Sequence, residues 1–381
     1  MKPFIKKVSS RRELKTFVKF PNRMYRNEKY YVPTLERGDM DALDRKKNHA
    51  FEVCEAEYWL ALDPATGNPV GRIAGIINRA YNEKMNVRQA RFGFMDFIDD
   101  NDVVDALFST VSSWAGARGM ESLCGPLGFL EFDAAGVLVE GFDQLPTPYG
   151  KYNYPYYEKQ MLRLGFSKDT DWIEIIVTVP DPLPDRYEKA AAIVAERYHL
   201  HTVPLKSKKQ MVEYFDGMAD LLNSTYGKLH GFSELTPGQV EDLKAQFVPN
   251  LSPEFVGIVQ DSNDRIIGFG ICMPSVAKAL QKARGKLFPF GFIHILHAIR
   301  HNDTVDTLLI GIDDKYKRKG VNSMIFSAIA PAFHKYGIKY IETTRELEDN
   351  NNNNNNNNIL NIWKEFEHRT AKRARCYVKA I

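Results

Sequence analysis

The stretch from residue 307 to residue 326 decides the fold, and it reads Thr307-Leu-Leu-Ile-Gly-Ile-Asp-Asp-Lys-Tyr-Lys-Arg-Lys-Gly-Val-Asn-Ser-Met-Ile-Phe326. Its apolar start is typical of a buried strand at 307–312, and the apolar spacing after it predicts a helix at 321–336. The backbone N–H groups at a helix N-terminus are unpaired and lie at the positive end of the helix dipole. Gly320 allows a close approach to them. Four basic residues occupy the same turn: Lys315, Lys317, Arg318 and Lys319. We therefore expect this turn to bind a phosphate group.

The same order of elements occurs twice along the chain. In the second half, the hairpin at 255–259 and 266–272 precedes this strand and helix, and strands at 338–343 and 376–378 follow it, with a helix expected at 359–366. The first half has matching segments: a hairpin at 58–62 and 70–77, a strand at 90–97, helices at 103–118 and 156–164, and a strand at 172–179. Alternating strands and helices after a hairpin indicate an α/β protein with a mixed sheet. We expect domains at 1–180 and 199–381, joined by a linker helix within 181–198.

Two stretches resemble the GNAT (Gcn5-related N-acetyltransferase) superfamily. Its pattern Q/R-x-x-G-x-G/A aligns with Lys317, Gly320 and Asn322, of which the lysine and the asparagine depart from it. The segment from Asn153 to Phe166, with Tyr157 at the start of a helix that ends in Gly-Phe, resembles the family's later helix. The resemblance implies two tandem GNAT-like domains.

The resemblance also implies acetyl-CoA or a longer acyl-CoA as co-substrate. The expected cofactor-binding residues are Ile312, Lys317, Arg318, Lys319, Gly320, Val321, Asn322 and Ser323. The matching turn of the first half, Phe97-Ile-Asp-Asp-Asn-Asp-Val103, has three aspartates and neither glycine nor a basic residue. Because carboxylates repel a pyrophosphate, we expect the first domain to be a degenerate copy.

The activity implied by the resemblance is N-acyl transfer from CoA by direct attack of an amine. Glu342 is the expected base, and Asp313, Asp314 and Glu346 are other candidates. Tyr157 or Tyr377 is the expected proton donor to the leaving thiolate. Two alternatives remain: a non-catalytic acyl-CoA- or lipid-binding protein on the same fold, and an aminoacyl-tRNA-dependent transferase. The expected acceptor is a small-molecule or peptide amine.

The composition and the motifs also argue against several other functions and locations. A net charge of +3 is too small to argue for DNA binding. Four scattered cysteines indicate reduced thiols. With no signal-like start and no long apolar run, we expect a cytoplasmic protein. His294, His297 and His301 share a helical spacing but have no carboxylate or cysteine nearby, so we expect no metal.

Three further segments leave alternatives open. The insertion at 274–302 combines Lys278, Lys282, Arg284 and Lys286 with the apolar run Leu287–Ile293. It suits a lid, an acyl-chain pocket, a membrane-surface contact or packing on the neighbouring domain. The basic tail Lys372–Arg375 suits either an exposed face or an anion contact. The run Asn350–Asn358 is either a polar loop or a flaw in the sequence record. The acyl length and the oligomeric state do not follow from the sequence.

Overall fold

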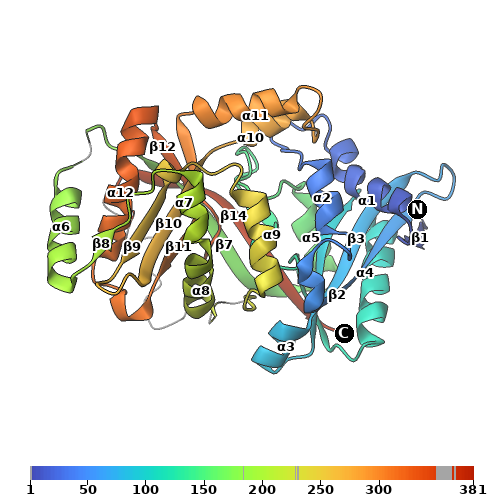
Figure 1. Ribbon diagram of the computed structural model, residues 1–381. Helices are drawn as coiled ribbons and strands as arrows, with labels where there is room; N and C mark the ends of the chain where they lie inside the picture. The colour runs from blue at the N-terminus through green and yellow to red at the C-terminus, as the bar shows by residue number, and fades with distance from the viewer. Residues whose placement is uncertain (1, 183, 228, 230, 349–362, 364–365) are drawn as a thin grey trace.

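The computed structural model describes residues 2–182, 184–227, 229, 231–348, 363 and 366–381 (Figure 1). The asparagine run and most of the helix expected at 359–366 lie outside these residues.

The N-terminal part of the chain supplies one half of a sheet and the helices that cover it. Its strands are β1 (Phe4–Lys7), β2 (Cys54–Leu62), β3 (Pro69–Asn78), β4 (Gln89–Phe97), β5 (Ser122–Gly125), β6 (Val137–Glu140) and β7 (Ser167–Thr178). Its helices are α1 (Arg11–Met24), α2 (Glu36–Ala42), η1 (His49–Glu52), α3 (Arg79–Met85), α4 (Asn101–Gly116) and α5 (Tyr156–Arg163).

The C-terminal part repeats this order after the connecting helix α6 (Arg186–Tyr198). Its strands are β8 (His201–Thr202), β9 (Val256–Gln260), β10 (Ile266–Pro274), β11 (Thr304–Ile312), β12 (Tyr340–Thr343), β13 (Glu346–Leu347) and β14 (His368–Ala380). Its helices are α7 (Lys208–Glu213), α8 (Phe215–Tyr226), α9 (Pro237–Phe247), η2 (Pro253–Phe255), α10 (Ala277–Ala283), α11 (Gly291–Arg300), η3 (Asp314–Tyr316) and α12 (Val321–Tyr336).

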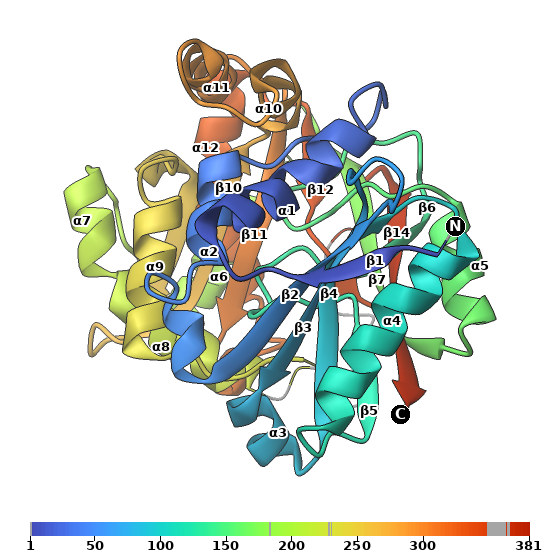
Figure 2. The ribbon, with the colours of Figure 1, turned by 90° about the vertical axis from the view of Figure 1, so that its right-hand side faces the viewer.

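The two halves exchange strands, so the described strands form one continuous mixed sheet. Its order is β1-β2-β3-β4-β5-β14-β7-β12-β11-β10-β9-β8 (Figures 1 and 2). The C-terminal strand β14 pairs with β5 of the first half, Tyr377 opposite Gly125. In return β7 pairs with β12 of the second half, Glu342 opposite Ile176. The domain boundaries at 180 and 199 stay a prediction, because the sheet runs across them.

Strand β14 is much longer than the strand expected at 376–378. Its basic residues are paired inside the molecule: Arg375 Nε lies 2.8 Å from Asp171 Oδ1, and Lys372 Nζ lies 2.8 Å from Glu174 Oε2. The basic tail is therefore part of the sheet and not an exposed face. These pairs let a charged segment lie between two other strands, which apolar patterning alone does not predict.

The C-terminal half-sheet is covered on both faces. Helix α12 packs on one face, where Gly270 of β10 leaves room: a Cβ atom there would lie 2.5 Å from Ile325 Cγ2. Helices α7, α8 and α9 cover the other face (Figure 1). The helical spacing of Met211, Phe215, Met218 and Leu222 in the sequence predicts a single helix at 209–226. That prediction is wrong, since the helix breaks at Tyr214 into α7 and α8. Its expected apolar face, which includes Met211 and Phe215, is nevertheless buried.

Candidate active site

Strands β11 and β12 separate at the centre of the C-terminal half-sheet. Their parallel pairing ends at Thr307 and Thr343, after which the chain turns toward β7, with Glu346 opposite Ile173. A cavity of about 440 Å³ fills the gap and is lined by residues 307–312 on one side and 344–348 on the other. This volume falls within the range of roughly 300–1,000 Å³ typical of ligand pockets.

The first end of the cavity lies at the N-terminus of α12. Gly320 is the N-cap residue, has φ +82° and makes no side-chain cap. A Cβ atom at Gly320 would lie 2.9 Å from Val194 Cγ2 of α6, so both the backbone conformation and the space favour glycine. The Ser323 N–H donates to the Gly320 carbonyl at 2.9 Å, so the N–H groups of Val321 and Asn322 are the ones left for a ligand. Lys317, Arg318 and Asn322 line the cavity beside them.

The eight residues predicted to bind the cofactor lie together around this turn. Ile312, Lys317, Arg318 and Asn322 line the cavity, and Val321 lies in the core beneath it. The Ser323 hydroxyl donates to the Gly320 carbonyl at 2.7 Å. Lys319 differs, because its ammonium lies over the Tyr198 ring, 5.0 Å from the centroid.

The matching helix of the first half has a closed N-terminus. Asp100 caps α4, and its carboxylate accepts from the backbone N–H of Asp102 at 3.0 Å and of Val103 at 3.3 Å. The amides that a phosphate would need are therefore occupied by a side chain that carries the same sign of charge.

Segments that precede β9 also line the cavity. Glu131, Phe132 and Tyr149 come from the long connection between β5 and α5, and Thr225, Tyr226 and Leu229 come from the end of α8 and the turn after it. The Tyr226 hydroxyl donates to the Ile310 carbonyl at 2.9 Å, inside the gap between the strands. Burial raises the pKa of Tyr226 to about 12, so this phenol remains protonated at neutral pH.

Arg345 contributes hydrogen-bond donors to the cavity wall. Its Nη2 donates to the Asp133 carbonyl at 2.6 Å. Its Nε and Nη1 atoms are buried and have no hydrogen-bond partner among the described residues, and neither has the Tyr149 hydroxyl. Burial lowers the pKa of Arg345. Buried donors of this kind are costly unless a ligand or water satisfies them.

Glu346 is the carboxyl group in the cavity whose acidity is most useful for catalysis. Burial raises its pKa to about 8, and the side chain lines the cavity beside Arg345. A carboxyl with this pKa exchanges its proton near neutral pH, as a general base must.

Glu342, the expected base, lies outside the cavity lining. Its Oε1 atom is 2.5 Å from Lys372 Nζ. Burial raises the pKa of Glu342, and the ion pair with Lys372 opposes that rise. The carboxylate therefore lies in a buried ionic network within the sheet.

The two expected proton donors also lie away from the cavity. Tyr157 is stacked on Phe97 in the core of the first half, and its hydroxyl lies 2.6 Å from Tyr25 Oη and accepts from Phe97 N at 3.0 Å. Tyr377 is buried on β14 and donates to Glu158 Oε1 at 3.2 Å. The structure does not bring either hydroxyl to the turn at Gly320.

The cavity residues missed in the sequence are Glu131, Phe132, Tyr149, Trp172, Tyr226, Arg345 and Trp363. The long connection at 126–155, which holds the first three, has one short strand, and such a connection is a signal of function. Nothing in the local pattern marks the others.

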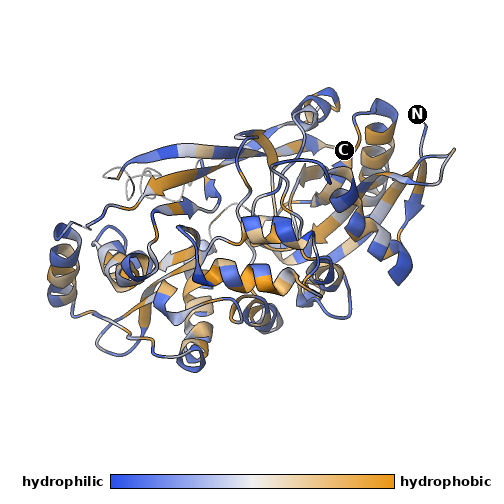
Figure 3. Cartoon of the chain, turned by 90° about the horizontal axis from the view of Figure 1, so that it is seen from above, coloured by the Kyte–Doolittle hydropathy of each residue, from blue (hydrophilic) through white to orange (hydrophobic). Residues whose placement is uncertain are grey.

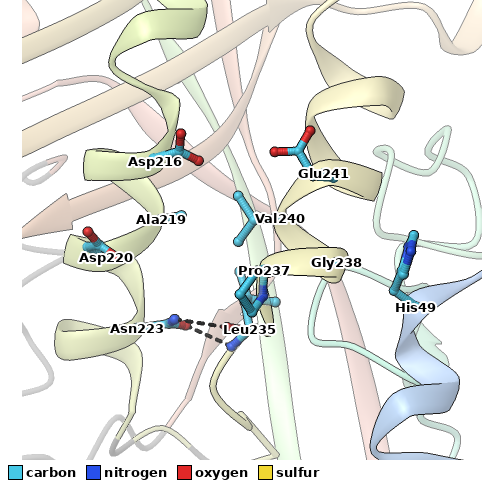
Figure 4. Close-up of a pocket in the computed structure, with 10 residues that line it drawn as sticks. All are labelled: His49, Asp216, Ala219, Asp220, Asn223, Leu235, Pro237, Gly238, Val240 and Glu241. Atoms are coloured by element: carbon cyan, nitrogen blue, oxygen red, sulfur yellow. Dashed lines mark hydrogen bonds between the residues drawn. The ribbon is translucent and has the colours of Figure 1, made fainter.

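Another pocket and a cluster of potential metal ligands are weaker candidates for a functional site. A hollow of about 460 Å³ lies between α8 and α9, with Asp216 and Asp220 on one side and Glu241 on the other (Figure 4). Lys244 pairs with Asp216 at 2.6 Å and with Glu241 at 2.7 Å.

Elsewhere Cys124, Asp169 and Cys376 hold three potential ligand atoms within 4.8 Å of one another. Burial raises the pKa of the Cys376 thiol, which disfavours the thiolate that a metal prefers. The expectation of no metal stays a prediction.

Comparison with known proteins places this geometry in context. No protein-family model matches the sequence. The chain is 24% identical over 386 residues to Protein YghO of Escherichia coli K12, covering 98% of this chain and 94% of that protein. It is 24% identical over 290 residues to the bacterial ceramide synthase of Caulobacter vibrioides, covering 76% and 74%.

Among solved structures, the tandem GNAT protein from the clavulanic acid biosynthesis pathway superposes with a TM-score of 0.54 at 11% identity. The match covers 99% of this chain and 98% of that one. This likeness confirms the mixed α/β fold class and the resemblance that the sequence indicated. The chain has the tandem GNAT fold.

Proposed function

We propose that the protein is an acyl-CoA-dependent N-acyltransferase whose active site is the cavity between β11 and β12–β13. The observation that carries the proposal is the position of this one cavity: it runs from the uncapped N-terminus of α12 to a carboxyl group with a pKa of about 8. The pyrophosphate of a CoA thioester needs the phosphate-binding turn, and the attacking amine needs the base.

The α12 end suits the pyrophosphate of CoA. Backbone N–H groups and the helix dipole attract phosphate, and Lys317 and Arg318 add positive charge at the cavity wall. Apolar residues of α12, among them Ile325, Ile329 and Phe333, line the cavity beyond the turn and suit an acyl chain. The name of the Caulobacter relative, bacterial ceramide synthase, also supports a long acyl group and a lipid-like amine acceptor.

The cavity wall that carries Glu346 and Arg345 suits the acceptor. The nitrogen of the neutral amine attacks the thioester carbonyl, and Glu346 takes the proton that the nitrogen loses as the C–N bond forms; the C–S bond then breaks. Tyr226, which reaches the gap between the strands through Ile310, is the phenol that returns a proton to the leaving thiolate. Arg345 and Tyr149 supply donors for a polar group of the acceptor. Glu346 and Tyr226 thus take the roles first expected of Glu342 and of Tyr157 or Tyr377.

Isothermal titration of acetyl-CoA and palmitoyl-CoA into three proteins tests the proposal. We expect the wild type to bind and Gly320→Glu to bind at least about 100-fold more weakly, because it places a carboxylate and a Cβ clash at the phosphate site. Gly337→Glu is the matched control: Gly337 also has positive φ, +66°, but caps the other end of α12. It should bind as the wild type does.

The two other outcomes are informative. If the wild type binds neither thioester, the CoA hypothesis fails and the aminoacyl-tRNA-dependent or non-catalytic readings take its place. Equal weakening by both glycine variants would mean that the loss comes from damage to α12 and not from the phosphate turn.

A further inference from the structure

The insertion between β10 and β11, hereafter the α10–α11 segment (residues 275–302), packs on the surface of the molecule (Figure 1). Gln281 Nε2 of α10 donates to the carbonyls of Lys29 at 2.8 Å and Tyr31 at 3.0 Å. The backbone N–H of Glu36 donates to the Gly285 carbonyl at 2.9 Å. The segment thus packs on the N-terminal part of the chain through α10, as one reading of the sequence expected.

The rest of the segment leaves large apolar side chains exposed. The exposed fraction is 72% for Phe288, 69% for Phe290, 51% for Leu296, 50% for Ile293 and 37% for Phe292. Residues 292, 293 and 296 lie on one face of α11, since positions three and four apart are neighbours on a helix. Figure 3 views the molecule from this side. A contiguous apolar surface of this kind marks an interaction site, because isolated globular proteins rarely expose one.

The same segment carries uncompensated positive charge. Its basic residues are Lys278, Lys282, Arg284, Lys286 and Arg300, and the stretch from 275 to 302 contains neither aspartate nor glutamate. All five are exposed. None of them forms an ion pair with another part of the chain that the structure describes. The net charge of the whole protein is only +3, so five positive charges on the α10–α11 segment are a local concentration of positive charge.

We propose that the α10–α11 segment docks the protein on an anionic lipid bilayer. Phe288, Phe290 and the exposed face of α11 enter the boundary between head groups and acyl chains, while the basic side chains meet lipid phosphates. A bilayer offers both partners in one plane. A second copy of the chain would instead bring two positively charged α10–α11 segments together, and like charges repel.

The contact is peripheral. Helix α11 has ten residues, and none of the helices in the described ranges has the length and apolar content needed to cross a bilayer. The proposal goes beyond the proposed reaction, and its test measures binding alone, so its failure would leave the acyltransferase proposal untouched.

Vesicle flotation of the full chain tests it, with phosphatidylcholine vesicles and with vesicles that contain phosphatidylglycerol. We expect the wild type to float with the phosphatidylglycerol vesicles, and the F288S/F290S double variant to lose at least about tenfold in partitioning, since each phenylalanine loses its burial in the lipid. K282Q/K286Q should lose about fivefold per charge, and only on the anionic vesicles. Both pairs are exposed, so the fold should tolerate the changes.

Ile193→Ser is the matched control, because Ile193 is 56% exposed on α6, outside the segment. It should float as the wild type does. Failure of the wild type to float, or flotation of the F288S/F290S variant at the wild-type level, would overturn the proposal. So would light scattering that finds a wild-type dimer converted to a monomer by F288S/F290S, because the apolar face would then join two copies of the chain.

Discussion

Lys372 of β14 and Glu174 of β7 form a buried ion pair, with 2.8 Å between Nζ and Oε2 and 4% of each side chain exposed. Lys372 also pairs with Glu342 of β12 at 2.5 Å. One ammonium group thus pairs with two carboxylates across β14, β7 and β12, the strands that the two halves of the protein exchange or share. Breaking a buried pair of this kind costs about 3–5 kcal/mol, because it leaves charge buried without a partner.

Lys372→Met should therefore destabilise the fold by about that amount at pH 8, measured by urea unfolding. Without Lys372, the pKa of Glu342, which burial already raises, rises further in the folded state. A folded-state pKa above the unfolded value makes stability fall as pH rises, so the variant should recover stability between pH 8 and pH 5.5. Lys168→Met is the control, since Lys168 is 42% exposed and its buried partner Asp171 keeps Arg373 and Arg375; it should cost less than about 1 kcal/mol. Equal losses in the two variants would contradict the role of Lys372.

Glu346→Gln should lower kcat/KM for acyl transfer by about 10²–10⁴-fold, because the amine loses its base. Release of the CoA thiol measures the rate. In the wild type the deprotonated carboxylate is the active form, so kcat/KM should rise with pH and level off above about 8. That rise should be absent from the variant.

Glu348→Gln separates this role from general loss of charge. Glu348 also lines the cavity, but Lys168 and Arg373 hold the pKa of its carboxyl below the usual range. Its substitution should leave the pH profile in place. A wild-type profile that is flat between pH 6 and pH 9 would exclude Glu346 as the base.

Arg345→Met should raise KM for the acceptor by about tenfold to 100-fold, from the loss of a charged hydrogen-bond donor worth about 1.5–3 kcal/mol. The affinity for acyl-CoA should not change, because Arg345 is not part of the α12 turn that we propose to hold the pyrophosphate. Arg345→Lys should restore part of the loss. A parallel fall in acyl-CoA affinity, measured by titration calorimetry, would show instead that the substitution distorts the whole cavity.

Tyr157→Phe should change stability and leave turnover within about twofold of the wild type. The lost hydroxyl contacts Tyr25 and accepts from the Phe97 backbone, and leaving these buried groups without a partner costs about 1–3 kcal/mol. Thermal unfolding and thiol release measure the two effects. A large fall in kcat with unchanged stability would return Tyr157 to the role of proton donor.

The sequence by itself determined the elements whose signals are local. The hairpin of β9 and β10, strand β11 and helix α12 each follow from periodicity and turn residues within about 20 positions, a range in which such patterns are reliable. The turn at Gly320 follows in the same way, because positive φ and an uncapped helix N-terminus are properties of one short segment. The acidic turn of the first half was predicted not to hold phosphate for an equally local reason, and Asp100 closes it.

Only the tertiary structure decided which side chains meet. Pairing of β14 with β5 and of β7 with β12 joins segments that are far apart in the chain, and no pattern within one segment encodes its partner. Glu342 and Glu346 lie four positions apart, and the sequence favoured Glu342 as the base, with Glu346 as a further candidate. Lys372, which comes from the C-terminal strand, pairs with the first. The separation of β12 from β11 leaves the second in a cavity, where burial is the main cause of its raised pKa. Burial and ion pairing depend on the whole fold, and so the chemistry of a carboxylate does too.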